Sequence, residues 1–230
     1  MRVLQGVKIF CNFVQMLSDE CQQKLQDIVR GEYPQGINDS CTAISYHLCK
    51  SFGTSPTIKS QFESNAILKE KQAAFLKEYA EEHYSLLSAL PSGSHYLTEG
   101  GEAKVYLAND YKHVIKVNDA GYYATWTEYF TSLIIHNLLF PNTPYKLLGF
   151  KFINEKLFAV LEQPFIEGEQ AALEDIQEFL EFNGFVKTRR QDYYHPEFHL
   201  VLEDMHDENV ITKDGAFFFI DTVFYIMEVG

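Results

Sequence analysis

The chain has little positive charge and no long apolar run. Its 230 residues carry 19 Lys and Arg against 32 Asp and Glu, a formal net charge of −13. This balance argues against nucleic-acid binding as a main activity, because binding a phosphate backbone depends on clustered cations. The apolar runs fall far short of the roughly 20 residues that cross a membrane, and no signal-peptide pattern opens the chain. We therefore expect a cytoplasmic, soluble protein that binds neither nucleic acid nor membrane.

Cysteine is also scarce, and the spacing of the cysteines argues against a zinc or redox site. The four cysteines all fall within the first fifty residues, at Cys11, Cys21, Cys41 and Cys49. Their separations match no common zinc or redox motif, so we expect thiols rather than a metal centre. With 46% hydrophobic and 15% aromatic residues, the chain has the composition of a globular protein rather than a disordered one.

The sequence changes character near Pro91. Before this residue, apolar residues recur with helical spacing. The predicted helices span residues 18–31, 38–52 and 62–84. Pro91-Ser92-Gly93-Ser94 then breaks the helical pattern. We predict a near-neutral helical N-terminal region at 1–90 and a second domain at 91–230, where ten basic and twenty-two acidic residues give a net charge of −12.

Short strand-like segments dominate the second region. They lie at residues 96–98, 103–107, 113–117, 146–153 and 157–161. Gly100-Gly101 and Asn109-Asp110 separate the first three, which predicts an antiparallel meander. Apolar segments at 122–140 and 170–183 are long enough for helices. The expected fold class is therefore α+β.

The C-terminal segment brings several polar residues to one place. Asp214-Gly215 predicts a two-residue hairpin turn, and its register places Asn209 opposite Ile220 and beside Asp221. Opposed strand residues lie about 4.5 to 5.5 Å apart, so Asn209 and Asp221 can share a hard cation such as Mg²⁺. Asp204 ends another apolar strand at the same junction. An ordinary polar turn would have a similar composition, but the arrangement also suits phosphoryl transfer, with Asp204 activating a hydroxyl.

The same residues resemble motifs of the protein-kinase-like superfamily. Asp204 to Asn209 is similar to the D-x-H-x-x-N catalytic loop, and Ile220-Asp221-Thr222 stands where the metal-binding segment falls. Val114-Ile115-Lys116 resembles the V-A-I-K strand. A closer resemblance, over about residues 70–226, is to the kinase domain of polyvalent proteins carried by bacterial phages and conjugative elements.

This resemblance implies an ATP·Mg²⁺-dependent phosphotransferase with a minimal kinase-like fold, formed by an antiparallel-sheet lobe and a reduced second lobe. Asp204 would be the catalytic base, and Asn209 and Asp221 would be the metal ligands. The implied nucleotide-binding residues are Gly100 and Gly101 of the glycine-rich loop, Lys116 with its ion-pair partner Glu128, and Glu162, Gln163 and Phe165 of the hinge against adenine. The acceptor would be a hydroxyl of an unknown protein or small molecule.

Departures from the kinase pattern keep two alternatives open. Leu202-Glu203-Asp204 replaces H-R-D, the glycine loop is incomplete, and with nine residues after Asp221 we expect no activation segment. One alternative is a catalytically inactive nucleotide-binding or interaction module, a pseudokinase. The other is a metal-dependent hydrolase in which Lys116 has no role and which uses Asp204, Asp207, Glu208 and Asp221.

Overall fold

The protein is described by a computed structural model. It describes residues 19–30, 32, 39–53, 62–83, 85–91, 93–101 and 103–227. Cys11 and Ser92 of the sequence predictions lie outside the described residues. Within these ranges there is no disulfide, and no helix is both long and apolar enough to cross a membrane.

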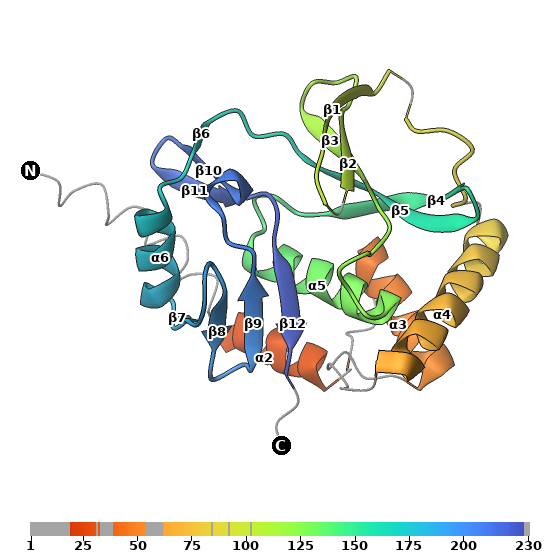
Figure 1. The fold of residues 1–230 in the computed structure, drawn as a ribbon, viewed down its shortest axis with the longest axis horizontal. Helices are drawn as coiled ribbons and strands as arrows, with labels where there is room; N and C mark the ends of the chain where they lie inside the picture. The colour runs from red at the N-terminus through yellow and green to blue at the C-terminus, as the bar shows by residue number, and fades with distance from the viewer. Residues whose placement is uncertain are drawn as a thin grey trace, which may run out of the picture.

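The fold is α+β, as predicted. The described residues form five α-helices and three sheets of antiparallel strands (Figure 1). The largest sheet has five strands in the order β1-β2-β3-β5-β4. These strands are β1 (His95–Glu99), β2 (Ala103–Leu107), β3 (His113–Asn118), β4 (Lys146–Ile153) and β5 (Lys156–Pro164). The predicted meander is therefore confirmed as β1 to β3, and β3 lies inside the sheet because β5 pairs with its other edge.

Helix α5 (Trp126–Leu139) lies beneath this sheet in Figure 1, and its N-terminus is capped twice. Thr125 accepts a hydrogen bond from the backbone N–H of Glu128. Gln72 of helix α4 (Phe62–Glu82) accepts from the N–H groups of Trp126 and Thr127 through Oε1, at 2.9 and 3.3 Å. The first N–H groups of a helix have no partner within the helix, so these contacts satisfy buried donors.

The remaining N-terminal helices pack on the same core. Helices α2 (Asp19–Val29) and α3 (Ser40–Phe52) confirm the two predicted helices there. Buried Leu25, Cys41 and Leu48 belong to one hydrophobic cluster with residues of α5. The division of the chain at residue 91 stays a prediction, and α2, α3 and α4 all contact α5.

The last third of the chain forms helix α6 and two small sheets. Helix α6 spans Leu173–Phe182. One sheet contains β6 (Glu169–Gln170), β10 (Val210–Lys213) and β11 (Ala216–Phe219), and the other contains β7 (Val186–Lys187), β8 (Tyr193–His195), β9 (Leu200–Glu203) and β12 (Val223–Ile226). Val210 pairs with Phe219, so the predicted hairpin register is confirmed. Strand β12, which the sequence did not predict, pairs with β9 and returns the chain past Asp204.

Candidate active site

A cleft of about 580 Å³ lies where the large sheet meets the loops around β9, β10 and β12. It is lined by the turn between β1 and β2, by β3, by the end of β5, by the loop after β9 and by the segment before β12. Eight of the ten predicted site residues line it: Gly100, Gly101, Lys116, Gln163, Phe165, Asp204, Asn209 and Asp221. The folded chain therefore brings together residues from positions 100 to 221.

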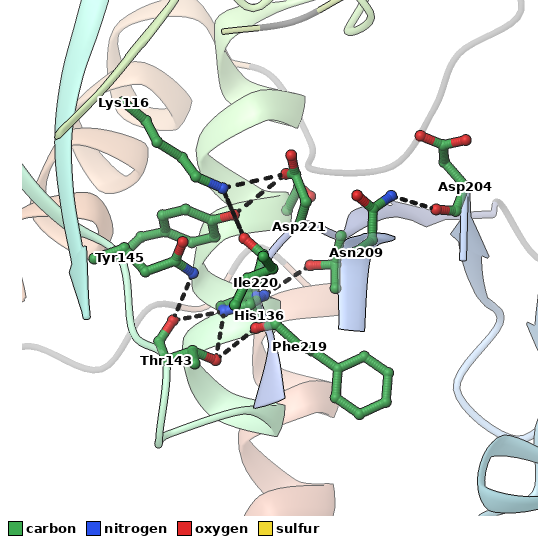
Figure 2. Close-up of polar contacts among 12 residues, drawn as sticks. Lys116, His136, Thr143, Tyr145, Asp204, Asn209, Phe219, Ile220 and Asp221 are labelled. Carbon is green, nitrogen blue, oxygen red and sulfur yellow. Dashed lines mark hydrogen bonds and ion pairs between the residues drawn. The ribbon is translucent and has the colours of Figure 1, made fainter. Parts of the chain in front are cut away.

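Lys116 of β3 is buried, with 8% of its surface exposed, and its ammonium is held by three groups. Nζ donates a hydrogen bond of 2.7 Å to the backbone carbonyl oxygen of Ile220. It lies 3.7 Å from Asp221 Oδ1 and 3.3 Å from Tyr145 Oη (Figure 2). A buried ammonium requires such partners because it has lost its hydration. The Lys116–Asp221 contact places a cation and an anion side by side at the base of the cleft.

Tyr145 fixes the geometry around this pair, and sequence reasoning missed it. Its hydroxyl lies 3.0 Å from the Ile220 carbonyl oxygen and 3.4 Å from Asp221 Oδ1, both of which can accept its proton. Its backbone N–H and C=O pair with the side-chain amide of Asn137 on α5, at 2.6 and 2.8 Å. The side chain of Asp221 is 48% exposed, so its carboxylate remains open to the cleft.

A buried network on α5 holds the segment that carries Asp221. The Nε2 atom of His136 lies 2.8 Å from the Thr143 carbonyl oxygen, and Nδ1 lies 2.7 Å from Thr222 Oγ1. A carbonyl only accepts, so the network assigns the proton to Nε2 and lets Nδ1 accept from Thr222. Burial lowers the pKa of His136 to about 3, which keeps the imidazole neutral. Thr143 Oγ1 donates to the Phe219 carbonyl oxygen at 2.6 Å, so both sides of Asp221 are fixed (Figure 2).

Asn209 links the segment that carries Asp221 to the backbone of Asp204. Its backbone carbonyl accepts from the Ile220 N–H at 2.9 Å, which places it beside the Asp221 segment. Its side-chain Nδ2 donates to the backbone carbonyl of Asp204 at 2.7 Å. Asp204 has a left-handed φ of 62°, and its half-exposed carboxylate lies 2.9 Å from His206 Nε2. The Asn209 bond therefore stabilises an uncommon backbone conformation at Asp204.

Gly100 and Gly101 form the turn between β1 and β2 above the cleft. Gly100 N–H donates to the Ala103 carbonyl oxygen at 3.0 Å, which closes the turn. A Cβ atom at Gly101 would collide with the hydroxyl of Tyr122. Glycine at this position therefore permits a close approach between the turn and Tyr122.

Of the three residues predicted for the hinge, two line the cleft and one does not, and their role against adenine stays a prediction. Gln163 and Phe165 line the cleft, and Gln163 Nε2 donates to the Thr143 carbonyl oxygen at 2.9 Å. Glu162 does not line the cleft, and its carboxylate instead lies 3.3 Å from Lys146 Nζ. Successive side chains of a strand point to opposite faces, so Glu162 and Gln163 cannot both face the cleft.

Glu128 is not placed where the kinase resemblance put it. Its carboxylate accepts from the Ala124 N–H at 3.0 Å, and with Thr125 it forms the T-x-x-E capping box of α5. Burial raises the pKa of Glu128, while the N–H groups of Ala124 and Thr125 and the charge of Lys69 act in the opposite direction. The ion pairs of the described residues include Lys116 with Asp221 but not Lys116 with Glu128.

The cleft offers oxygen ligands for only part of a metal coordination sphere. Within the described ranges, no group of three or more His, Cys, Asp and Glu side chains could hold a metal ion. The Asn209 amide and the half-exposed Asp221 carboxylate stay the predicted ligands of a hard cation. Mg²⁺ often binds through one or two protein carboxylates and completes its octahedron with water and substrate phosphates.

Comparison with known families gives a match over most of the chain. Residues 69–228 match the family described as Serine/Threonine/Tyrosine Kinase found in polyvalent proteins. The chain belongs to this kinase family. No curated protein matches the chain, and no solved structure matches it either.

The family match begins inside α4, and the matched part of this helix makes polar contacts with the segment before α5. Lys69, the first matched residue, donates to the backbone carbonyl oxygens of Ala120 and Tyr123 at 2.6 and 2.7 Å. Gln72, one turn later, caps α5. Helix α4 of this kinase-family chain is therefore bonded to the connection between β3 and α5. Nothing in the apolar pattern of residues 62–84 indicated these polar contacts.

Proposed function

We propose that the chain is an ATP·Mg²⁺-dependent phosphotransferase that transfers the γ-phosphoryl group to a hydroxyl of a protein or small molecule. The observation that carries this proposal is the contact between Lys116 and Asp221 beside Asn209. A cation for phosphates and two oxygen ligands for Mg²⁺ meet at the base of one cleft, in a chain of a kinase family.

In this proposal the cleft separates two lobes. The large sheet and α5 form the nucleotide lobe, with the Gly100-Gly101 turn over the phosphates and with Gln163 and Phe165 beside the adenine. Helix α6 and the small sheets form the reduced second lobe, which supplies Asp204. The bound nucleotide would lie between them, as its phosphates require contacts with both.

The negative charge of the cleft means that binding of nucleotide phosphates requires cations. Glu99, Asp204, Glu208 and Asp221 line the cleft, and Lys116 is its only Lys or Arg among the described lining residues. Phosphates would be repelled by this carboxylate-rich wall, so Mg²⁺ supplies the charge neutralisation when the nucleotide binds. The Lys116–Asp221 contact of 3.7 Å is longer than a hydrogen bond, which leaves both groups able to turn toward phosphate and metal.

Asp204 would orient the acceptor hydroxyl. The acceptor oxygen forms a bond to the γ-phosphorus, the bond from that phosphorus to the β,γ-bridging oxygen breaks, and ADP leaves. The hydroxyl proton passes to the Asp204 carboxylate, which is 62% exposed and therefore accessible to an acceptor. Catalysis in such sites comes mainly from positioning and charge stabilisation.

A nucleotide-binding module without catalysis is the second candidate. One observation favours it: Glu128 caps α5, so Lys116 lacks the helix glutamate that positions it in active kinases. In this chain the Lys116 ammonium contacts Asp221 and Tyr145 instead of a glutamate. Because the family occurs in polyvalent proteins, we also propose that the chain acts as a domain of a larger cytoplasmic protein of bacterial phages or conjugative elements.

Thermal unfolding with and without ATP and Mg²⁺ tests the proposal. At an ATP concentration about 100 times the Kd, binding stabilises a fold by about 2.7 kcal/mol, or about 5–10 °C at this size. We expect such a shift only when Mg²⁺ is present, and we expect Asp221→Asn to remove the dependence on Mg²⁺. A shift accompanied by ADP formation supports the phosphotransferase, and a shift without turnover supports the inactive module. The absence of any shift would contradict both.

A further inference from the structure

A second, smaller cavity adjoins the nucleotide cleft. It has a volume of about 230 Å³, and it shares Tyr122, Asp204 and Val223 with the large cleft. Asp204 therefore lies on the boundary between the two spaces, and the side chain on that boundary which carries a hydroxyl is Tyr122. This boundary is where an acceptor hydroxyl would have to meet both the γ-phosphoryl group and the base.

Tyr122 is held at this boundary from two sides. Its backbone carbonyl oxygen accepts a hydrogen bond of 3.2 Å from the hydroxyl of Tyr225 on β12. Its own hydroxyl packs against the Gly101 turn, so closely that any side chain at residue 101 would displace it. Yet Tyr122 is 60% exposed, so its phenol is open to the cleft rather than part of the core.

The other hydroxyls near the cleft are less well placed to accept a phosphoryl group. Thr222 is 5% exposed and bonded to His136. Thr98 lines the large cleft but not the small cavity, whereas Tyr225 lines only the small cavity. Among the described residues, Tyr122 alone carries a hydroxyl and lines both spaces.

We propose that Tyr122 is a self-phosphorylation site, modified by the cleft of its own chain. This inference rests on the proposed phosphotransferase function. The Tyr122 phenolic oxygen bonds to the γ-phosphorus of ATP as the bond to the β,γ-bridging oxygen breaks, ADP leaves, and the phenolic proton passes to Asp204. Arg190 lines the small cavity and offers a guanidinium for the new phosphate.

The modification would also limit further nucleotide binding. A phosphotyrosine adds about −1.5 to −2 charges at the boundary where Asp204, Glu203 and Asp192 already lie. These like charges would repel the phosphates of a second ATP. We therefore expect the phosphorylated chain to show a smaller ATP·Mg²⁺ thermal shift than the unmodified chain.

Mass spectrometry of the whole chain after incubation with ATP·Mg²⁺ tests the site. We expect one phosphate per chain, mapped to the peptide that contains Tyr122. Tyr122→Phe should lose nearly all of it, whereas Tyr111→Phe should keep it, because Tyr111 is similarly exposed at 63% but lies outside both spaces. Site mapping on the unmodified sequence does not depend on the folding of any variant. Phosphate on other residues and none on Tyr122 would overturn the inference.

Two further experiments distinguish a failure of the Tyr122 inference from a failure of the proposed phosphotransferase function. Modification within one chain predicts a fractional rate that is independent of protein concentration, and Tyr122→Phe protein should not phosphorylate Tyr122 of added Lys116→Met protein. Concentration-dependent labelling, or labelling of the added protein, would contradict action within one chain. ADP formation without phosphate on Tyr122 would overturn this inference alone, whereas no ATP·Mg²⁺ shift would overturn the proposed function itself.

Discussion

The side-chain nitrogen of Asn209 donates a hydrogen bond of 2.7 Å to the backbone carbonyl oxygen of Asp204. One residue is the proposed metal ligand, and the other is the proposed base. The bond spans five residues of the loop and supports a left-handed backbone at Asp204. One hydrogen bond therefore joins the proposed metal ligand to the backbone of the proposed base.

Asn209→Asp should separate these two roles. The new carboxylate keeps an oxygen for Mg²⁺ but cannot donate to the Asp204 carbonyl oxygen, and it repels that oxygen. We expect the Mg²⁺-dependent ATP shift to persist and the rate of phosphoryl transfer to fall about 10- to 100-fold, since small misplacements of a catalytic group have effects of this size. Turnover assays and thermal unfolding on the same sample measure both. An unchanged rate would mean that the bond does not position Asp204.

His136→Gln should reduce the sensitivity of stability to acid. The pKa of His136 is about 3 in the folded chain against an ordinary value of 6.5. The unfolded chain therefore binds a proton between these values and the folded chain does not, so the free energy of unfolding falls as pH drops from about 6.5 toward 3. The slope from this group approaches about 1.4 kcal/mol per pH unit.

Glutamine can donate to the Thr143 carbonyl and accept from Thr222, but it does not titrate. Urea unfolding at several pH values should show a smaller loss of stability on acidification in His136→Gln than in the unmodified protein. The difference between the two proteins removes the contributions of other groups, including Glu128, whose raised pKa acts in the opposite direction. Parallel pH profiles would contradict the assignment of a buried neutral imidazole.

Gln72→Ala should destabilise the fold through the N-terminus of α5. Gln72 is fully buried and makes three hydrogen bonds, two to backbone N–H groups and one to Thr127 Oγ1. Buried donors left without partners cost about 1–3 kcal/mol each, so we expect a loss of about 3 kcal/mol and a fall in Tm of about 6–12 °C. The matched control is Gln23→Ala, an exposed helical glutamine bonded only to Asp27 in the contacts described. A similar effect of both substitutions would contradict the capping role.

Local sequence signals predicted the hairpin and the position of Asn209 in it. The Asp214-Gly215 turn fixed the hairpin register, and the register alone placed Asn209 beside the Asp221 segment. Lys116 was recognisable because an ammonium within an apolar strand requires a specific partner. Both signals depend on backbone periodicity and on residues close in the sequence.

The contacts that support the site were not predictable in this way. His136 and Thr222 are 86 residues apart in the sequence, and Tyr145 and Ile220 are 75 residues apart. Such pairs depend on how α5 packs against the hairpin, which no local pattern determines. The contacts of Glu128 differ from the predicted ion pair with Lys116, and the Thr125-to-Glu128 capping signal that accounts for them is present in the sequence.

Calorimetric titration with ATP·Mg²⁺ tests the central claim most directly, which is that Lys116 binds nucleotide phosphates in this cleft. Lys146→Met is the matched control, since Lys146 lies on the same sheet outside the cleft and its exposed pair with Glu162 contributes little stability. We expect the unmodified protein and Lys146→Met to bind equally, and Lys116→Met to bind at least about tenfold more weakly, because a charge-assisted hydrogen bond contributes about 1.5–3 kcal/mol. Equal affinity of Lys116→Met and the unmodified protein, or no binding by the unmodified protein, would contradict the account.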